Sequence, residues 1–309
     1  MVTRVTTPGN YSAVLANLLA AQQRQMEAGD KVATQKNGKD LKDYAKNSEL
    51  LTAMRSVQTR ISTFQDQNQL TADKLSTQDT AISRVADTAQ QVRQIMSEAI
   101  ASGRVDTLVE DIQAQMGDAV EAMNARYGGK YLFAGGQVDT RPVTATQLTD
   151  LTSGPPISSF FQNDNFKTQA KLDESTNITT GVLASDIGTN MLTAFQTFEQ
   201  FNQGGSGPFT GQMTAAQKTF LEGQLANWDQ VRSDVTDLAA RNGTNQKRVD
   251  SITTDLGTRQ TSLQGMVGDI TDADMGEAAA ALQQAQLSVQ SAAYVFQTLQ
   301  SSSLINLLK

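Results

Sequence analysis

The sequence predicts a mainly α-helical protein: a long antiparallel coiled-coil rod built from N- and C-terminal helices, with a small mixed α/β insert at its outer end. Two long stretches at opposite ends of the chain carry apolar residues in steps of three and four. Such steps average 3.5 residues, which keeps a stripe facing a partner helix along a left-handed supercoil. Between them, residues 130–210 are punctuated by glycine and proline, which predicts turns and short strands.

The two apolar stripes are called the rod seams. The first contains Met54, Val57, Ile61, Phe64, Leu75, Ile82, Val85, Ala89, Val92, Met96 and Ala99. The second contains Trp228, Val231, Val235, Leu238, Val249, Ile252, Leu256, Leu263, Met266 and Ile270. Neither stripe is stable in water alone, so the two helices are expected to pair.

Polar residues interrupt both seams. They are Asn68, Thr71 and Gln78 in the first, and Asn242, Asn245 and Arg259 in the second. Buried polar residues in a coiled coil lower its stability but fix register and partner. The alternative interpretation is a loosely packed hairpin that admits solvent.

The pattern divides the chain into five segments. Residues 1–45 form an N-terminal helix, expected over 9–28, and a loop over 29–46 with at most one helical turn. Residues 46–129 hold the first rod helix, ending near Gly103, and a second helical piece over 105–126 that the pair Gly128-Gly129 is expected to stop. The insert spans 130–210, the second rod helix 211–270, and a final helix 271–309.

Within the insert, Tyr131-Leu132-Phe133 reads as a short β-prone run, and residues 167–172 and 175–182 alternate well enough for edge strands. A helix is expected from Asp186, which is a suitable N-cap.

The first and last segments are expected to pair with each other and to be buried in a polymer. Such a pair is weakly stable in isolation, and the apolar C-terminal end is a liability unless something covers it. The predicted intersubunit contact residues are Tyr11, Leu15, Leu18, Leu19, Leu282, Val289, Phe296, Leu299, Leu304, Leu307 and Leu308.

Composition narrows the possible functions. The net charge is −7 and the basic residues are scattered, so nucleic acid is not expected as a ligand. No apolar run approaches the ~20 residues that a membrane span needs, and residues 1–8 lack the layout of a secretory signal. Both a cytoplasmic protein and one exported without a signal peptide fit these observations.

Cysteine and histidine are both absent, which removes thiolate nucleophiles, disulfides, imidazole ligands and the usual general base. Chance explains this in a chain rich in small residues. An advantage for a chain threaded unfolded through an export channel explains it equally well.

No pattern supports an enzyme, a cofactor or a metal site. Asp272 and Asp274, at i and i+2, point to different sides of a helix. Gly128-Gly129-Lys130 lacks the spacing that wraps phosphates. The residues that begin at Asn177 and at Asn242 fit the glycosylation sequon, which is common by chance.

Three motifs resemble those of bacterial flagellins and their hook-associated relatives. Residues 270–278 (Ile-Thr-Asp-Ala-Asp-Met-Gly-Glu-Ala) resemble the family's Ile-x-Asp-x-Asp-x-x-Glu segment, residues 303–308 its apolar terminus, and residues 242–249 the segment before that helix. The resemblance implies that the terminal helices pair in the core of a tubular polymer while the central part faces outward.

Within the family, residues 128–136 and 139–142 are most similar to the hook-associated protein 3 branch, the junction subunits between hook and filament. This resemblance implies self-association, hook-associated protein 1 and flagellin as axial neighbours, an export chaperone and the type III export apparatus as further partners, and an extracellular location on the flagellum. A flagellin filament subunit is the first alternative. A cytoplasmic coiled-coil adaptor is the second.

Overall fold

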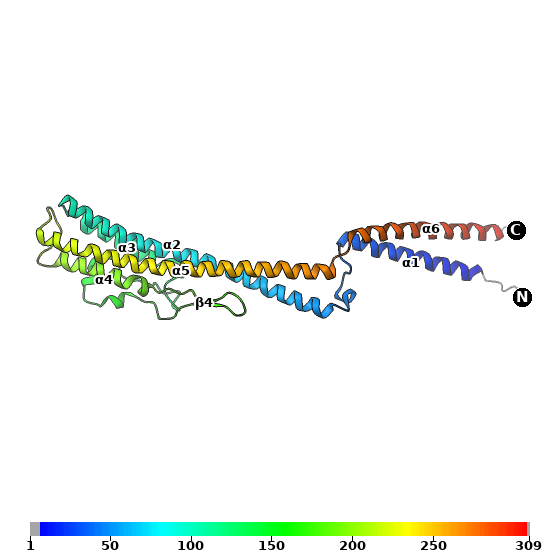
Figure 1. Cartoon of the computed structure of the whole chain (residues 1–309), viewed down its shortest axis with the longest axis horizontal. Coiled ribbons are helices and arrows are strands. Elements are labelled where there is room, and N and C mark those ends of the chain that lie inside the picture. Colours follow the sequence, from blue (N-terminus) through cyan, green and yellow to red (C-terminus); the bar gives the residue numbers. More distant parts are fainter. Residues whose placement is uncertain (1–6, 308–309) are drawn as a thin grey trace. The chain divides into compact units, whose positions relative to one another are not determined.

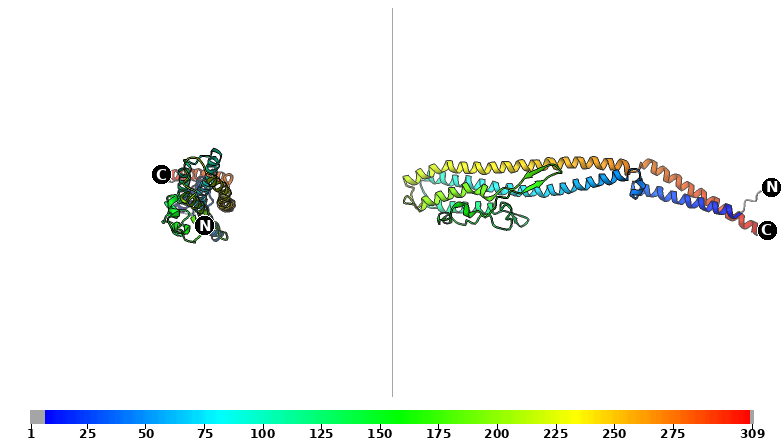
Figure 2. Two further views of the ribbon diagram at one scale, coloured as in Figure 1. Left: turned by 90° about the vertical axis from the view of Figure 1, so that its left-hand side faces the viewer. Right: turned by 90° about the horizontal axis from the view of Figure 1, so that it is seen from below.

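The computed structural model describes the backbone of residues 7–307 and the side chains of residues 11–301. The chain forms two compact units. Unit 1 comprises Met1–Arg60 and Thr258–Lys309, and unit 2 comprises Ile61–Gly257. Figures 1 and 2 trace the helices and strands of each unit.

The described chain is mainly helical, as predicted. The helices are α1 (Thr7–Thr34), α2 (Ser48–Ser102), α3 (Leu108–Met123), α4 (Ala184–Gln203), α5 (Ala215–Thr271) and α6 (Met275–Leu307). Three short 3₁₀ helices occur at η1 (Leu41–Tyr44), η2 (Leu148–Thr152) and η3 (Ile157–Phe160). The strands are β1 (Arg126–Tyr127), β2 (Lys130–Tyr131), β3 (Gln169–Lys171) and β4 (Asn177–Thr179).

In unit 2, α2 and α5 run antiparallel. Gln78 contacts Asn242, whereas Arg93, further along α2, forms an ion pair of 2.7 Å with Asp229, which lies earlier in α5. Helices α3 and α4 complete the core around the paired seams. Trp228 is fully buried and meets Phe195 of α4 edge-on at 4.8 Å between ring centroids. The predicted fold class, long paired N- and C-terminal helices with a small strand-containing insert, is confirmed.

The seam residues differ in burial. Those buried are Ile61, Leu75, Ile82, Val85, Val231, Val235, Val249 and Leu256. Those half-buried are Val57, Phe64, Leu238, Ile252 and Leu263. Met266 is 41% exposed, so its side chain lies off the seam in the single chain.

The polar seam residues of unit 2 hold the insert to the helices. Asn242 donates from Nδ2 to the Leu75 carbonyl at 2.9 Å and accepts from Gln78 Nε2 at 3.1 Å. Gln78 Nε2 also donates to the Thr180 carbonyl, and Asn68 Nδ2 donates to the Leu172 carbonyl, both at 3.1 Å. These amides are buried. They therefore fix the helix register and anchor both ends of the β3–β4 hairpin.

The prediction that Gly128-Gly129 stops a helix is wrong. Helix α3 already ends at Met123, and the two glycines form the turn between the antiparallel strands β1 and β2. Both have positive φ, 56° and 82°, the conformation that a tight two-residue hairpin requires and that glycine adopts without strain. The Arg126 guanidinium lies 4.1 Å from the centre of the Tyr131 ring across this hairpin.

Several predicted boundaries shift. Helix α1 continues to Thr34, so the predicted loop over 29–46 begins later and contains η1. Helix α3 is shorter than 105–126, and α4 begins at Ala184 with Leu183, not Asp186, at its N-cap. The predicted edge strands are present as the shorter pair β3 and β4.

Side chains pin the irregular part of the insert. Asn124 bonds both the backbone N–H and the carbonyl of Val143, at 2.9 and 3.0 Å. Asp164 accepts from the backbone N–H of Gly136 and of Phe166, each at 2.9 Å, and these two bonds hold the pKa of its carboxyl below the usual range. Loop positions are thus set by the hydrogen bonds of individual side chains rather than by a sheet.

Candidate interface of the terminal helices

In unit 1, α1 and α6 pack side by side (Figure 1). The Tyr11 and Phe296 rings lie 5.1 Å apart, and a Cβ on Gly29 would lie 4.0 Å from Leu282. Early residues of α1 therefore meet late residues of α6, so the pair is antiparallel.

Small residues bring the two helices close. Ala21 and Ala28 of α1 and Ala278 and Ala285 of α6 are buried, all at less than a tenth of full exposure. Together with the half-buried Val14, Leu18, Leu282, Val289, Ala292, Phe296 and Leu299 they follow the three-and-four steps of a coiled-coil seam. Because alanine buries little area, this seam contributes less stability per turn than the leucine, valine and methionine seam of unit 2.

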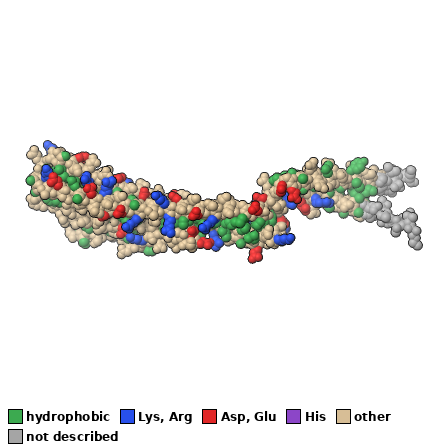
Figure 3. All heavy atoms as spheres, in the orientation of Figure 1, with side chains coloured by type: hydrophobic (Ala, Val, Ile, Leu, Met, Phe, Trp, Pro, Cys, Tyr) green, Lys and Arg blue, Asp and Glu red, His purple; other side chains and the backbone are tan. Residues whose placement is uncertain are grey.

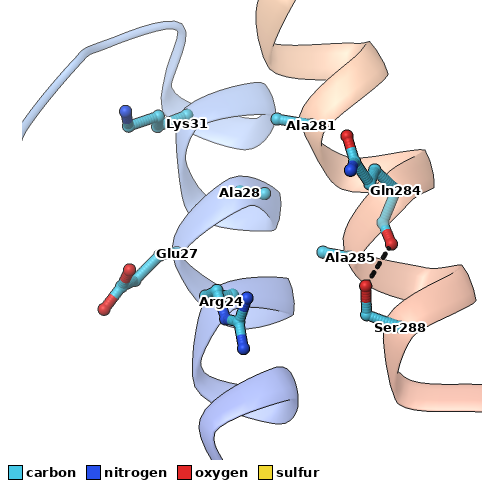
Figure 4. Close-up of a pocket in the computed structure, with 8 residues that line it drawn as sticks. All are labelled: Arg24, Glu27, Ala28, Lys31, Ala281, Gln284, Ala285 and Ser288. Carbon is cyan, nitrogen blue, oxygen red and sulfur yellow. Dashed lines mark hydrogen bonds between the residues drawn. The ribbon is translucent and has the colours of Figure 1, made fainter.

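A groove of about 310 Å³ follows one side of this pair. In Figure 4, Ala28 of α1 and Ala285 of α6 point toward each other, and Glu27 points away from α6. Ser288 donates to the carbonyl of Gln284 at 2.9 Å, so its hydroxyl is used within α6. Among the described residues, no group of three or more Asp and Glu side chains is placed to hold a metal ion.

A second apolar stripe on each helix faces away from the partner helix. Its most exposed members are Leu19 at 57% and Met26 at 65% on α1, and Leu287 at 57% and Tyr294 at 72% on α6. Leu15 and Val295 are also exposed, and Tyr11, whose ring contacts Phe296 across the pair, is 41% exposed. Exposed apolar residues repeated along one helix pair mark an interaction surface rather than isolated surface positions.

Most of the α1/α6 pair also carries no charged side chain. Residues 7–23 and 278–308 contain no Asp, Glu, Lys or Arg. Covering the surface formed by residues 7–23 and 278–308 would therefore bury no charged group and would incur no cost of desolvating one. Burial against other protein is the environment that suits such a surface.

The predicted intersubunit residues fall into three groups. Tyr11, Leu15 and Leu19 are exposed, whereas Leu18, Leu282, Val289, Phe296 and Leu299 are half-buried in the α1/α6 seam. Leu304, Leu307 and Leu308 lie outside the residues whose side chains are described. Their intersubunit role stays a prediction. The predicted list omits Met26, Leu287 and Tyr294, which a search for a second stripe on each helix would have added.

The connections at the base of the pair are clasped together. The Ala273 N–H donates to the Gln35 carbonyl at 2.9 Å and the Asn37 N–H to the Thr271 carbonyl at 2.8 Å, and Lys36 forms an ion pair with Asp272. That hydrogen-bonded ammonium lowers the pKa of the Asp272 carboxyl. The Tyr44 hydroxyl donates to the Thr271 carbonyl at 3.2 Å. We call these contacts the clasp.

Asp274 caps α6. Its carboxylate accepts from the N–H of Gly276 at 2.8 Å and of Glu277 at 3.2 Å. The two acids that flank Ala273 therefore have separate structural roles, one in the clasp and one at a helix N-terminus, where a negative charge is favourable.

Throughout the described chain, no helix is both long and apolar enough to cross a membrane.

Two family models match the chain over its helical ends. Residues 5–137 match the bacterial flagellin N-terminal helical region, and residues 225–308 match the bacterial flagellin C-terminal helical region. The part between, 138–224, holds most of the insert and the start of α5. No curated protein matches the chain.

Solved structures share the fold at low identity. A flagellar hook-associated protein from Vibrio parahaemolyticus aligns with a TM-score of 0.61 and 15% identity, covering 74% of this chain and all of that one. FlgL from Bacillus cereus aligns at 0.53 and 12%, and FlgL from Xanthomonas campestris at 0.51 and 13%, each covering 71% of this chain and 99% of its own.

The matches cover every helix of the α1/α6 pair and most of the α2/α5 pair, which are the elements that carry the seams and the exposed stripes. The chain therefore belongs to the bacterial flagellin family, and is a structural subunit of an extracellular flagellar assembly rather than an enzyme.

Proposed function

We propose that this chain is the junction subunit between the hook and the filament of a bacterial flagellum. It enters a tubular lattice through α1 and α6 after export as an unfolded chain. The observation that carries the proposal is the second apolar stripe on α1 and α6, most of which lies within the charge-free residues 7–23 and 278–308. That surface is suited to burial between copies, which a lattice provides.

The junction role, as opposed to a filament role, draws on two further observations. The motif over 128–142, which resembles the hook-associated branch, folds as one structure: Leu132 and Phe133 are buried, and the Phe133 carbonyl accepts from the Ala184 N–H that opens α4. The three solved structures reported above are named as hook-associated protein or FlgL.

The proposal fixes the expected partners. Hook-associated protein 1 and flagellin would be the neighbours along the axis, and further copies of this chain the neighbours around it. Before export, the uncovered stripes of α1 and α6 would need a flagellar export chaperone, because exposed apolar surface promotes aggregation. Absence of both cysteine and histidine suits passage through a type III export apparatus.

Deletion of the gene tests the role. Cells without the protein should form hooks and export flagellin, but should lose it to the medium, because the first filament subunit has no lattice position to occupy. Immunogold labelling of isolated flagella should place the protein in a band at the hook end. Label along the whole filament would support the filament alternative, and arrested flagellin export would contradict the junction role.

A truncation separates the interface from the rest of the chain. Removing residues 276–309 deletes almost all of α6 but none of unit 2, whose core lies within 61–257. The truncated protein should keep the thermal transition of unit 2 and fail to restore motility in the deletion strain. Loss of the unit 2 transition would show that α6 stabilises the single chain instead.

A further inference from the structure

Unit 1 carries two segments of opposite charge beside the clasp. Residues 35–60, called the basic edge, contain six Lys and Arg against three Asp and Glu. Residues 258–277, called the acidic edge, contain four Asp and Glu against one Arg. The basic edge comprises the η1 connection and the start of α2, and the acidic edge the end of α5 and the start of α6.

Contacts within the chain use only part of this charge. Lys36 pairs with Asp272, Lys39 with Asp30 at 2.5 Å, and Lys42 with Asp40 at 3.5 Å. Lys46 and Arg55 on the basic edge and Asp269 and Glu277 on the acidic edge are exposed and form no ion pair among the described residues. Each edge thus keeps surplus charge for an outside partner.

Apolar side chains accompany the charges on both edges. Leu41 and Leu50 on the basic edge are 40% and 48% exposed, and Met266 and Met275 on the acidic edge are 41% and 40% exposed. Figure 3 shows hydrophobic side chains gathered over the start of α2 and the end of α5, with charges of both signs around them. An apolar centre with a charged rim is the usual composition of a protein interface.

Each edge complements the other and repels itself. A contact between two like edges would set like charges against each other, which is unfavourable. A head-to-tail contact places the basic edge of one copy against the acidic edge of the next, and repetition of such a contact generates rings or helical arrays. The occupant that fits both edges is therefore a second copy of this chain.

We propose that neighbouring copies dock edge to edge through unit 1, with Lys46 and Arg55 of one copy facing Asp269 and Glu277 of the next and Leu41, Leu50, Met266 and Met275 filling the contact. This inference rests on the proposed function, because it assumes that copies assemble. It adds a second, charged contact to the exposed apolar stripes of α1 and α6.

Cysteine cross-linking tests the contact directly, because the native chain has no cysteine. Lys46→Cys and Asp269→Cys are introduced into separate full-length copies, and the two variants are co-expressed in the deletion strain. Oxidation of isolated flagella should give disulfide-linked dimers from the mixture and none from either variant alone. Dimers from either variant alone would show that like edges meet and would overturn the proposal.

A second pair of cysteine variants distinguishes absence of the edge contact from absence of assembly. Leu19→Cys and Leu287→Cys, co-expressed in the same way, probe the exposed stripes of α1 and α6. Dimers from this pair with none from positions 46 and 269 would overturn the edge contact and leave self-assembly standing. No dimers from either pair would overturn both proposals.

Charge reversal supplies an independent measurement. Lys46→Glu with Arg55→Glu, or Asp269→Lys with Glu277→Lys, should lower the amount of protein retained on flagella about tenfold, since each leaves two edges of like charge. The variant with all four reversals should regain it, because its edges are again complementary. Asp87→Lys with Asp118→Lys, exposed in unit 2, is the control and should have no effect. Retention by both half-reversed variants, or loss in the fully reversed one, would overturn the proposal.

Discussion

The two helix pairs of this molecule follow the same seam spacing but reach different degrees of burial. In unit 2 the α2/α5 seam has large side chains, and Leu75, Ile82, Val85, Val92 and Met96 have no exposed surface. In unit 1 the α1/α6 seam is built on alanine, its larger residues are half-buried, and further apolar residues face outward.

The difference shows where each pair obtains its stability. Unit 2 covers most of its seam with α3, α4 and the insert, so the core of the seam is buried in the single chain. Unit 1 leaves apolar area exposed, and at about 25 cal/mol per Å² that area is stabilising only once another molecule covers it. We expect substitutions in unit 2 to change monomer stability and substitutions in unit 1 to change assembly.

The largest effect is expected from Val85→Asp. Val85 is fully buried in the seam of unit 2, and a carboxylate there would be desolvated without a partner. The free energy of unfolding should fall by roughly 3–5 kcal/mol. Thermal melts followed by circular dichroism measure this, with Ser83→Asp at an exposed position of the same helix as the control. Equal melting of Val85→Asp and the native chain would refute the paired seam.

A smaller effect within unit 2 is expected from Asn242→Leu. The substitution removes the bonds to the Leu75 carbonyl and to Gln78, and leaves the buried Gln78 amide with one partner fewer. The cost should be about 1–3 kcal/mol, measured by urea unfolding against Asn227→Leu on the exposed face of α5. An Asn242→Leu variant that is more stable than the native chain would show that the buried amides fix the register of the helices without stabilising the fold.

The seam was predictable because periodicity reports directly on which face of a helix is buried. Asn68, Gln78 and Asn242 were also recognised as polar seam positions. Their partners were not, because Gln78 and Asn242 lie 164 residues apart and the hairpin carbonyls are backbone groups that carry no sequence signal.

The insert was harder to predict for a related reason. Its loops are fixed by the hydrogen bonds of individual side chains such as Asn124 and Asp164, and neither residue belongs to a periodic pattern. The glycine pair at 128 and 129 fits both a helix stop and a hairpin turn, and only the pairing of the flanking strands decides between them. In unit 1, only part of the exposed stripes was predicted, because residue type alone does not show whether a side chain is exposed.

Val289→Asp tests the expectation that substitutions in unit 1 change assembly more than monomer stability. Val289 is half-buried in the α1/α6 seam, so an aspartate there can turn toward solvent. The monomer should lose only about 1 kcal/mol, yet retention on flagella should be abolished, since assembly would bury the charge. Analytical denaturation and a motility assay in the deletion strain measure the two effects, with Gln290→Asp on the exposed face as the control. A loss of monomer stability as large as that of Val85→Asp would remove the distinction between the units.

The smallest effect is expected at two helix ends where different residues, one in each unit, adopt the same left-handed backbone conformation. Helix α2 ends at Ser102 and is followed by Gly103 with φ of 68°, and α1 ends at Thr34 and is followed by Gln35 with φ of 59°. This left-handed conformation costs a residue with a side chain about 1–2 kcal/mol, whereas glycine adopts it freely but loses more chain entropy on folding. Gln35→Gly should therefore stabilise unit 1 by about 0.5 kcal/mol, because it keeps the backbone bonds from Gln35 N–H to Lys31 and from Ala273 N–H to Gln35.

Hydrogen exchange at Ala273 N–H reports on the clasp and should slow roughly twofold. Gly103→Gln should act in the opposite direction and accelerate exchange at its own N–H, which donates to the Ala99 carbonyl at 2.9 Å. Faster exchange at Ala273 in Gln35→Gly would show that the glutamine side chain, rather than the backbone, stabilises the clasp.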